Sequence, residues 1–128
     1  MAHVQHHPAI IGWQLDNETK HYDNIGRYMQ EGFVRSLQEK YPDLRQLNHD
    51  FGLDYWSNRI DRWQDFPPVE NTINASLACA FSRYQRQQVT EYLAWQAAIV
   101  REYAQPHPFV TPNFDFEWRG YSYGVQPR

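Results

Sequence analysis

A mostly apolar run, residues 10–15, ends abruptly in Asp16, Asn17 and Glu18. A glutamate can give and take a proton, and it is best suited to donate one where neighbouring aromatic side chains partly desolvate it. A strand buried on both faces has such a near-continuous apolar character, and a (β/α)8 barrel carries its catalytic side chains at the carboxyl ends of these strands. The run therefore predicts a barrel strand that presents an acid, with the function at Asn17 and Glu18.

Side-chain alternation sets a condition on this site. Neighbouring strand residues normally point to opposite faces, so Asn17 and Glu18 can act on one ligand only if the strand ends or is bulged at Asn17. The polar residue Asp16 permits such a break. A turn-forming asparagine and a solvated loop glutamate are the ordinary alternatives. Asp16, Asp115 and Glu117 are candidates for supporting hydrogen bonds or for loop structure alone.

The segment His7–Glu18 closely resembles the acid-bearing fourth strand of family 42 glycoside hydrolases, the bacterial β-galactosidases of that group. Further blocks that resemble the family follow in order and bring the resemblance to nearly all 128 residues: Leu47–Leu53, Tyr55–Arg59, Trp95–Gln96, Ile99–Tyr103, Phe109–Asp115 and Trp118–Pro127. Several such blocks in order are far more specific than a lone Asn-Glu pair.

The resemblance implies a retaining hydrolase that removes terminal non-reducing β-D-galactose residues. Such enzymes use two carboxyl groups, one as acid/base and one as nucleophile. Glu18 matches the family's acid/base, and Asn17 matches the asparagine expected to hydrogen-bond the 2-hydroxyl of the sugar. The nucleophile belongs on the seventh strand, which we do not find here, so we expect the isolated chain to be inactive. The family is commonly a homotrimer and requires no cofactor, although some members carry a structural zinc.

Other residues are weaker site candidates. Asn113, where the fifth strand meets the barrel top, and Trp118, in a loop, are predicted to bind substrate. Trp56 and Trp63 also lie in predicted loops, where an aromatic face can stack on a pyranose ring. Buried aromatics that hold a long loop in place are equally common. Asn58 and Arg59 are weaker again.

Charge and composition exclude several classes of partner. A net charge of -3 and a pI near 6.0, with acids and bases interspersed, leave no basic stripe for nucleic acid. No apolar run approaches the ~20 residues of a membrane helix, and no leader is evident, so we expect a cytoplasmic protein. Cys79, the single cysteine, is predicted to be a small core residue. His3, His6 and His7 are expected to lie on the surface without a metal.

Helical periodicity predicts the elements between the strands. Asp23 or Asn24 is expected to cap a helix that ends at Tyr41, before Pro42, and Asp43 to cap a short helix that ends at Gly52. The aromatic, proline-broken segment 53–72 is predicted to be a long functional loop. Asn74 would cap a helix through Tyr103 with one apolar stripe, formed by Leu77, Phe81, Tyr84, Tyr92, Trp95, Ile99 and Tyr103. Residues 109–114 would be the fifth strand, with Pro112 near its end.

The fold class that the resemblance implies is α/β: a partial (β/α)8 TIM barrel that contains strands four and five with the intervening helices. A complete barrel needs about 250 residues, so we interpret residues 1–128 as one fragment of a glycoside hydrolase catalytic domain. The alternative is a non-catalytic carbohydrate-binding or interaction module derived from such a barrel. That alternative predicts sugar binding without turnover, but a binding module should close its own sheet, which two parallel strands do not.

Overall fold

The computed structural model describes residues 4, 7–19, 24–104 and 109–113. It contains two compact units, one formed by residues 1–22 with 86–128 and the other by residues 23–85. Each unit is described separately below. None of the helices in the described ranges combines the length and the apolar character needed to cross a membrane.

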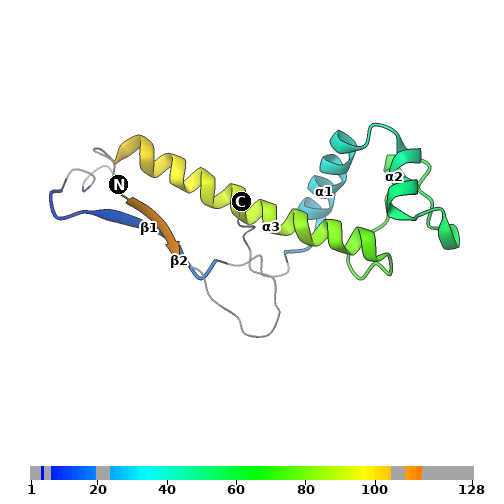
Figure 1. The fold of residues 1–128 in the computed structure, drawn as a ribbon, viewed down its shortest axis with the longest axis horizontal. Coiled ribbons are helices and arrows are strands. Elements are labelled where there is room, and N and C mark those ends of the chain that lie inside the picture. The colour runs from blue at the N-terminus through cyan, green and yellow to red at the C-terminus, as the bar shows by residue number, and fades with distance from the viewer. Residues whose placement is uncertain (1–3, 5–6, 20–23, 105–108, 114–128) are drawn as a thin grey trace. The chain divides into compact units, whose positions relative to one another are not determined.

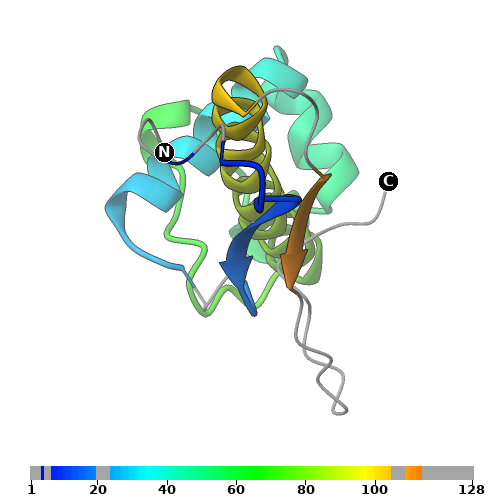
Figure 2. The ribbon, with the colours of Figure 1, turned by 90° about the vertical axis from the view of Figure 1, so that its left-hand side faces the viewer.

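The first unit contains a pair of parallel strands, β1 (Gly12–Asn17) and β2 (Phe109–Asn113) (Figure 2). Both lie where the sequence predicts strands, and the carboxyl ends of both lie at the same edge of the pair. The prediction that β1 is buried on both faces is wrong for the described residues, because every side chain of β1 is exposed or only partly buried. The faces of a parallel strand are buried by the layers that pack above and below the sheet, and the described residues do not cover β1 fully on either side.

The strand pair is bulged just before its carboxyl end. Gln14 pairs with Thr111 and Asn17 pairs with Asn113, so β1 uses three steps where β2 uses two, and one extra residue lies in β1. Pro112 lies opposite this irregularity. Proline has no N–H to donate, and within sheets it is tolerated at edges and bulges. The break that the sequence analysis required near Asn17 is therefore present.

The long helix α3 (Ala75–Tyr103) begins as predicted, because the side chain of Asn74 accepts a hydrogen bond from the N–H of Leu77 at 2.8 Å. Figures 1 and 2 show its C-terminal part beside the two strands. The buried residues of this part recur at steps of three or four: Val89, Leu93, Ala97, Val100 and Ala104, the last directly after the helix.

The single apolar stripe predicted for α3 is only partly correct. Leu77 and Phe81 are buried, but Tyr92 is 50% exposed, Trp95 60% and Tyr103 48%. Trp95 lies about five full turns after Leu77 and therefore on the same side of an ideal helix, yet it is exposed. The buried residues of the C-terminal part, such as Leu93 and Ala97, lie on roughly the opposite side of the helix from Leu77. The prediction that Cys79 is a core residue is also wrong, since this cysteine is exposed. It lies two positions, or about 200°, around the helix from Leu77.

The second unit is helical. It contains α1 (Arg27–Lys40), α2 (Leu44–Phe51) and two short 3₁₀ turns, η1 (Tyr55–Ser57) and η2 (Trp63–Asp65). Asp43 caps α2 as predicted, because its carboxylate accepts from the N–H of Arg45 at 2.9 Å, and Gly52 ends that helix in the left-handed conformation. The predicted cap of α1 is wrong: Asn24 does not occupy the N-cap position, and Asp23 lies outside the described residues. Gly26 is the N-cap and makes no side-chain hydrogen bond.

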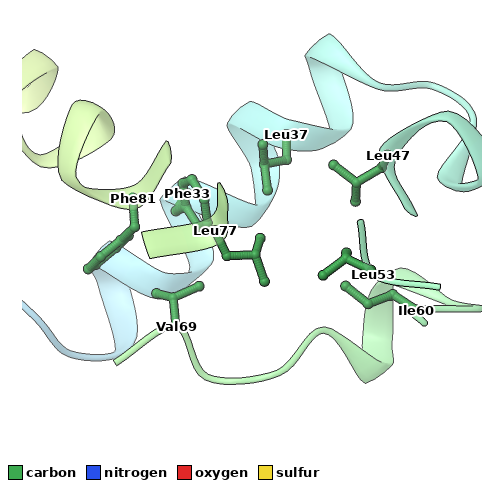
Figure 3. Packing of buried hydrophobic residues seen from close by; sticks show 8 residues of the cluster. All are labelled: Phe33, Leu37, Leu47, Leu53, Ile60, Val69, Leu77 and Phe81. Atoms are coloured by element: carbon green, nitrogen blue, oxygen red, sulfur yellow. The ribbon is translucent and has the colours of Figure 1, made fainter. Parts of the chain in front are cut away.

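One hydrophobic cluster holds the second unit together. Figure 3 shows its eight side chains pointing toward one another from the helices and from the loop after α2: Phe33, Leu37, Leu47, Leu53, Ile60, Val69, Leu77 and Phe81. Phe33 packs edge-on against Phe81, with ring centroids 5.3 Å apart. Leu53, Ile60 and Val69 belong to the segment predicted to be a functional loop, so much of that loop serves the core.

Candidate functional site

The carboxyl ends of β1 and β2 bring three predicted site residues together. The side-chain amide of Asn113 donates a hydrogen bond to Oδ1 of Asn17 at 2.9 Å. The backbone N–H of Glu18 donates to the carbonyl of Asn113 at 2.8 Å. Asn17 and Glu18 from one segment and Asn113 from another, almost a hundred residues later, thus form one hydrogen-bonded group at the edge of the strand pair.

Glu18 has an unusual backbone conformation. Its φ is 53°, in the left-handed region that residues with a side chain seldom occupy. This conformation costs about 1–2 kcal/mol for a residue other than glycine, and such strain persists only where surrounding contacts enforce it. The strand therefore stops at Glu18, and the alternation of side chains that governs β1 no longer applies to this residue.

The carboxylate of Asp16 supports the turn. Its Oδ1 accepts from the backbone N–H of Asn17 at 2.8 Å, and its Oδ2 accepts from the hydroxyl of Thr19 at 2.8 Å. Thr19 is only 7% exposed. Asp16 is one of the acids for which the sequence left supporting hydrogen bonds and loop structure open, whereas Thr19 was missed. The Asp-x-x-Thr spacing was the available signal, since a short side chain can bond to groups two or three residues away.

The hydrogen-bonded group at the strand ends is open to solvent. Asn17, Glu18 and Asn113 are all exposed. The partial desolvation expected at Glu18 is therefore not provided by the described residues. Trp118, Asp115 and Glu117, the other predicted residues near this end of the chain, lie outside the described residues, as do His3 and His6. No group of three or more potential metal ligands gathers in the described ranges.

The two remaining tryptophan candidates belong to the helical unit and differ in their surroundings. Trp56 is 73% exposed, has a left-handed backbone with φ 57°, and lies 5.8 Å from the ring of Tyr55. Trp63 stacks on Phe66, with centroids 6.2 Å apart and planes at 8°. It lines an open pocket of about 410 Å³, whose polar walls are Gln30, Glu31, Arg35 and Gln38.

Asn58 and Arg59 make structural contacts in the loop. The amide of Asn58 donates to the carbonyl of Tyr55 at 3.0 Å. The guanidinium of Arg59 forms ion pairs with Asp61 at 2.8 Å and with Asp54 at 2.7 Å. Hydrogen bonds to Asp61 and then to Asp54 are the main reasons that the pKa of Arg59 is raised above its ordinary value. Both side chains therefore contribute contacts within the loop.

Comparison with known proteins identifies the family of the chain. The model of glycoside hydrolase family 42, described as beta-galactosidase, matches residues 1–125. The chain is 33% identical over 113 residues to the beta-galactosidase BgaH of Haloferax lucentense, a match that covers 84% of this chain and 17% of that protein. It is 31% identical to the beta-galactosidase Bga of Halorubrum lacusprofundi, with 84% and 16% covered.

A third relative is the beta-galactosidase BgaA of Clostridium cellulovorans, which is 31% identical, with 82% of this chain and 16% of that protein covered. The chain thus spans about one sixth of the length of the curated relatives that it matches.

Proposed function

The chain belongs to glycoside hydrolase family 42, and from this membership we propose that it supplies the acid/base side of the active site of a retaining β-galactosidase. The observation that carries the proposal is the hydrogen-bonded group of Asn17, Glu18 and Asn113 at the carboxyl ends of two parallel strands. In parallel α/β folds, ligands bind beyond this edge of the sheet.

Glu18 is the proposed general acid/base. Its protonated carboxyl group gives a proton to the glycosidic oxygen while a second carboxylate, outside this chain, attacks the anomeric carbon from about 5–5.5 Å away. The bond to the leaving group breaks, and a covalent galactosyl-enzyme forms. Glu18, now ionised, takes a proton from water as that water attacks the anomeric carbon, and galactose leaves with its configuration retained.

Asn17 is the proposed contact to the sugar. Its Oδ1 already accepts from Asn113, so its amide nitrogen keeps two N–H donors for a ligand hydroxyl. A hydrogen bond to the 2-hydroxyl strengthens as the oxocarbenium-like transition state develops. The hydrogen bond from Asn113 fixes which way round the Asn17 amide lies, with its oxygen toward Asn113. Asn113 therefore has an orienting role at the proposed site.

The proposed fold is a (β/α)8 barrel in which β1 and β2 are strands four and five. Apolar side chains that face solvent beside the strand pair support it, since Ile11 is 76% exposed and Phe109 is 58% exposed. Such residues are expected to be covered by further strands and helices. A β-galactoside substrate, no required cofactor and a homotrimer are accompanying proposals taken from the family resemblance, and a cytoplasmic location is proposed from the sequence alone.

The decisive experiment is kinetic analysis of Glu18→Gln in the full-length gene product that carries this segment. We expect kcat/KM for phenyl β-galactoside to fall by about 10²–10⁴, the usual contribution of a general acid. Azide, which needs no base, should react with the galactosyl-enzyme to give β-galactosyl azide with retained configuration. Glu39→Gln, which changes an exposed glutamate of α1, is the matched control.

Unchanged hydrolysis of phenyl β-galactoside by Glu18→Gln would overturn the proposed role. Galactoside binding by the full-length protein without any turnover would instead support the non-catalytic binding module. The two outcomes are separated by isothermal titration with galactose alongside the rate measurements.

A further inference from the structure

The left-handed backbone of Glu18 is held from both sides. On one side, its own N–H is bonded to the carbonyl of Asn113 on the neighbouring strand at 2.8 Å. On the other, the two oxygens of the Asp16 carboxylate bond to the residues directly before and after Glu18. The Asp16 carboxylate thus bonds to both chain neighbours of Glu18, and this support does not depend on a contact with the Glu18 carboxyl group.

The spacing explains why Asp16 suits this place. The bulge in β1 lies between Gln14 and Asn17, so Asp16 sits within the irregular part of the strand. There, its short side chain can turn back toward the N–H of Asn17 and the hydroxyl of Thr19. Hydrogen bonds to an ionised acceptor are shorter and stronger than neutral ones, and Thr19 is nearly buried, which shelters one of them from water.

We propose that Asp16 is a positioning residue, whose carboxylate holds Glu18 in the left-handed conformation that aims its carboxyl group at the glycosidic oxygen. This inference rests on the proposed function and extends it by one residue. Without Asp16, residue 18 can relax toward an extended conformation. The change of φ moves the Glu18 side chain away from the common site with Asn17, because alternation along the strand is then restored.

The test compares leaving groups in the full-length gene product. Phenyl β-galactoside needs a proton on its leaving oxygen, whereas 2,4-dinitrophenyl β-galactoside departs without one. For Asp16→Ala we expect kcat/KM to fall by about 10²-fold with the phenyl substrate and by less than about fivefold with the dinitrophenyl substrate, since only the first depends on the acid. Thr19→Val removes one of the two hydrogen bonds to Asp16. It should show the same difference between substrates, with a fold-loss of kcat/KM on the phenyl substrate about a third to a tenth as large as that of Asp16→Ala.

Controls separate positioning from folding. Asp16→Asn keeps an acceptor for the N–H of Asn17 but loses the second carboxylate oxygen, so it should retain more activity than Asp16→Ala. Asp50→Ala changes an exposed carboxylate on α2 and should leave both substrates unaffected. Equal losses of Asp16→Ala on both substrates, or no loss on either, would overturn the proposal.

A structural measurement distinguishes this inference from the proposed function. If the wild-type full-length protein hydrolyses no β-galactoside, the proposed function fails on that result alone. In a crystal structure of the Asp16→Ala protein, or of Thr19→Val if the former does not fold, a φ at Glu18 that leaves the left-handed region supports the holding role. A φ that stays near its present value of 53° refutes it.

Discussion

At the scale of single residues, the site is organised by polar contacts between side chains and backbone. Asn113 contributes twice, through its carbonyl to the N–H of Glu18 and through its amide to Oδ1 of Asn17. The first contact belongs to the backbone and survives substitution, whereas the second belongs to the side chain. The two roles of Asn113 can therefore be tested apart.

We expect Asn113→Ala in the full-length protein to lower kcat/KM for β-galactosides by about five- to tenfold. A neutral hydrogen bond contributes about 1 kcal/mol, and its loss frees the Asn17 amide to rotate. With a 2-deoxygalactoside, which lacks the hydroxyl assigned to Asn17, the penalty should nearly vanish. A full penalty on the deoxy substrate would show that Asn113 acts through some group other than Asn17.

At the scale of elements, the segment after α2 depends on one buried asparagine. Asn48 is 0% exposed, and its amide nitrogen donates to the carbonyls of Leu44 and Ile60, each at 2.8 Å. Its oxygen accepts from the N–H of Ile60 at 2.9 Å. These bonds attach the loop to α2 at Ile60. The side chain of Ile60 packs in the hydrophobic cluster, so hydrogen bonds to Asn48 and apolar packing fix the same residue of the loop.

Asn48→Ala should lower the free energy of unfolding by about 2–4 kcal/mol, because it leaves the buried N–H and C=O of Ile60 without their partner. Asn58→Ala is the matched control; its amide is exposed and makes one local bond, so the loss should stay below about 1 kcal/mol. Urea unfolding of both variants, made in the full-length protein, measures the difference. Equal stabilities of the two would mean that the loop is held by its apolar contacts alone.

At the scale of the whole molecule, several large apolar side chains near the two strands and along α3 are exposed to solvent. Ile11 lies directly before β1 and Phe109 is the first residue of β2. Tyr92, Trp95 and Tyr103 lie on the C-terminal half of the helix. The rings of Tyr92 and Trp95 lie next to each other, with centroids 6.0 Å apart, and exposed apolar surface favours association with other surfaces. The same residues are those that a surrounding barrel would be expected to cover.

The 128-residue chain expressed alone is accordingly predicted to self-associate and to hydrolyse no galactoside, since the proposed nucleophile lies outside it. Sedimentation velocity and a thermal scan measure the first property, and release of phenol from phenyl β-galactoside measures the second. A sharply cooperative monomeric melt would contradict the predicted association. Turnover that Glu18→Gln abolishes would contradict the predicted inactivity.

Local signals were sufficient for much of the secondary structure. Both strands, the caps at Asp43 and Asn74, and the left-handed end at Gly52 follow from the sequence, because each depends on residues within three or four positions. Asn17 and Glu18 could likewise be named as candidates, since they follow an apolar run, and Asn113 could be named because it lies near the end of the predicted fifth strand. The cap at Gly26 was missed because no side-chain bond marks it.

Only the tertiary structure decided how these pieces meet. The register that sets Asn113 against Asn17, the bulge opposite Pro112 and the left-handed backbone at Glu18 depend on pairing between segments almost a hundred residues apart, which no local pattern encodes. The exposure of Cys79 and of the aromatic residues on α3 was decided in the same way. An amphipathic pattern shows that a helix has an apolar face, but the neighbours that pack against it determine which apolar residues are buried.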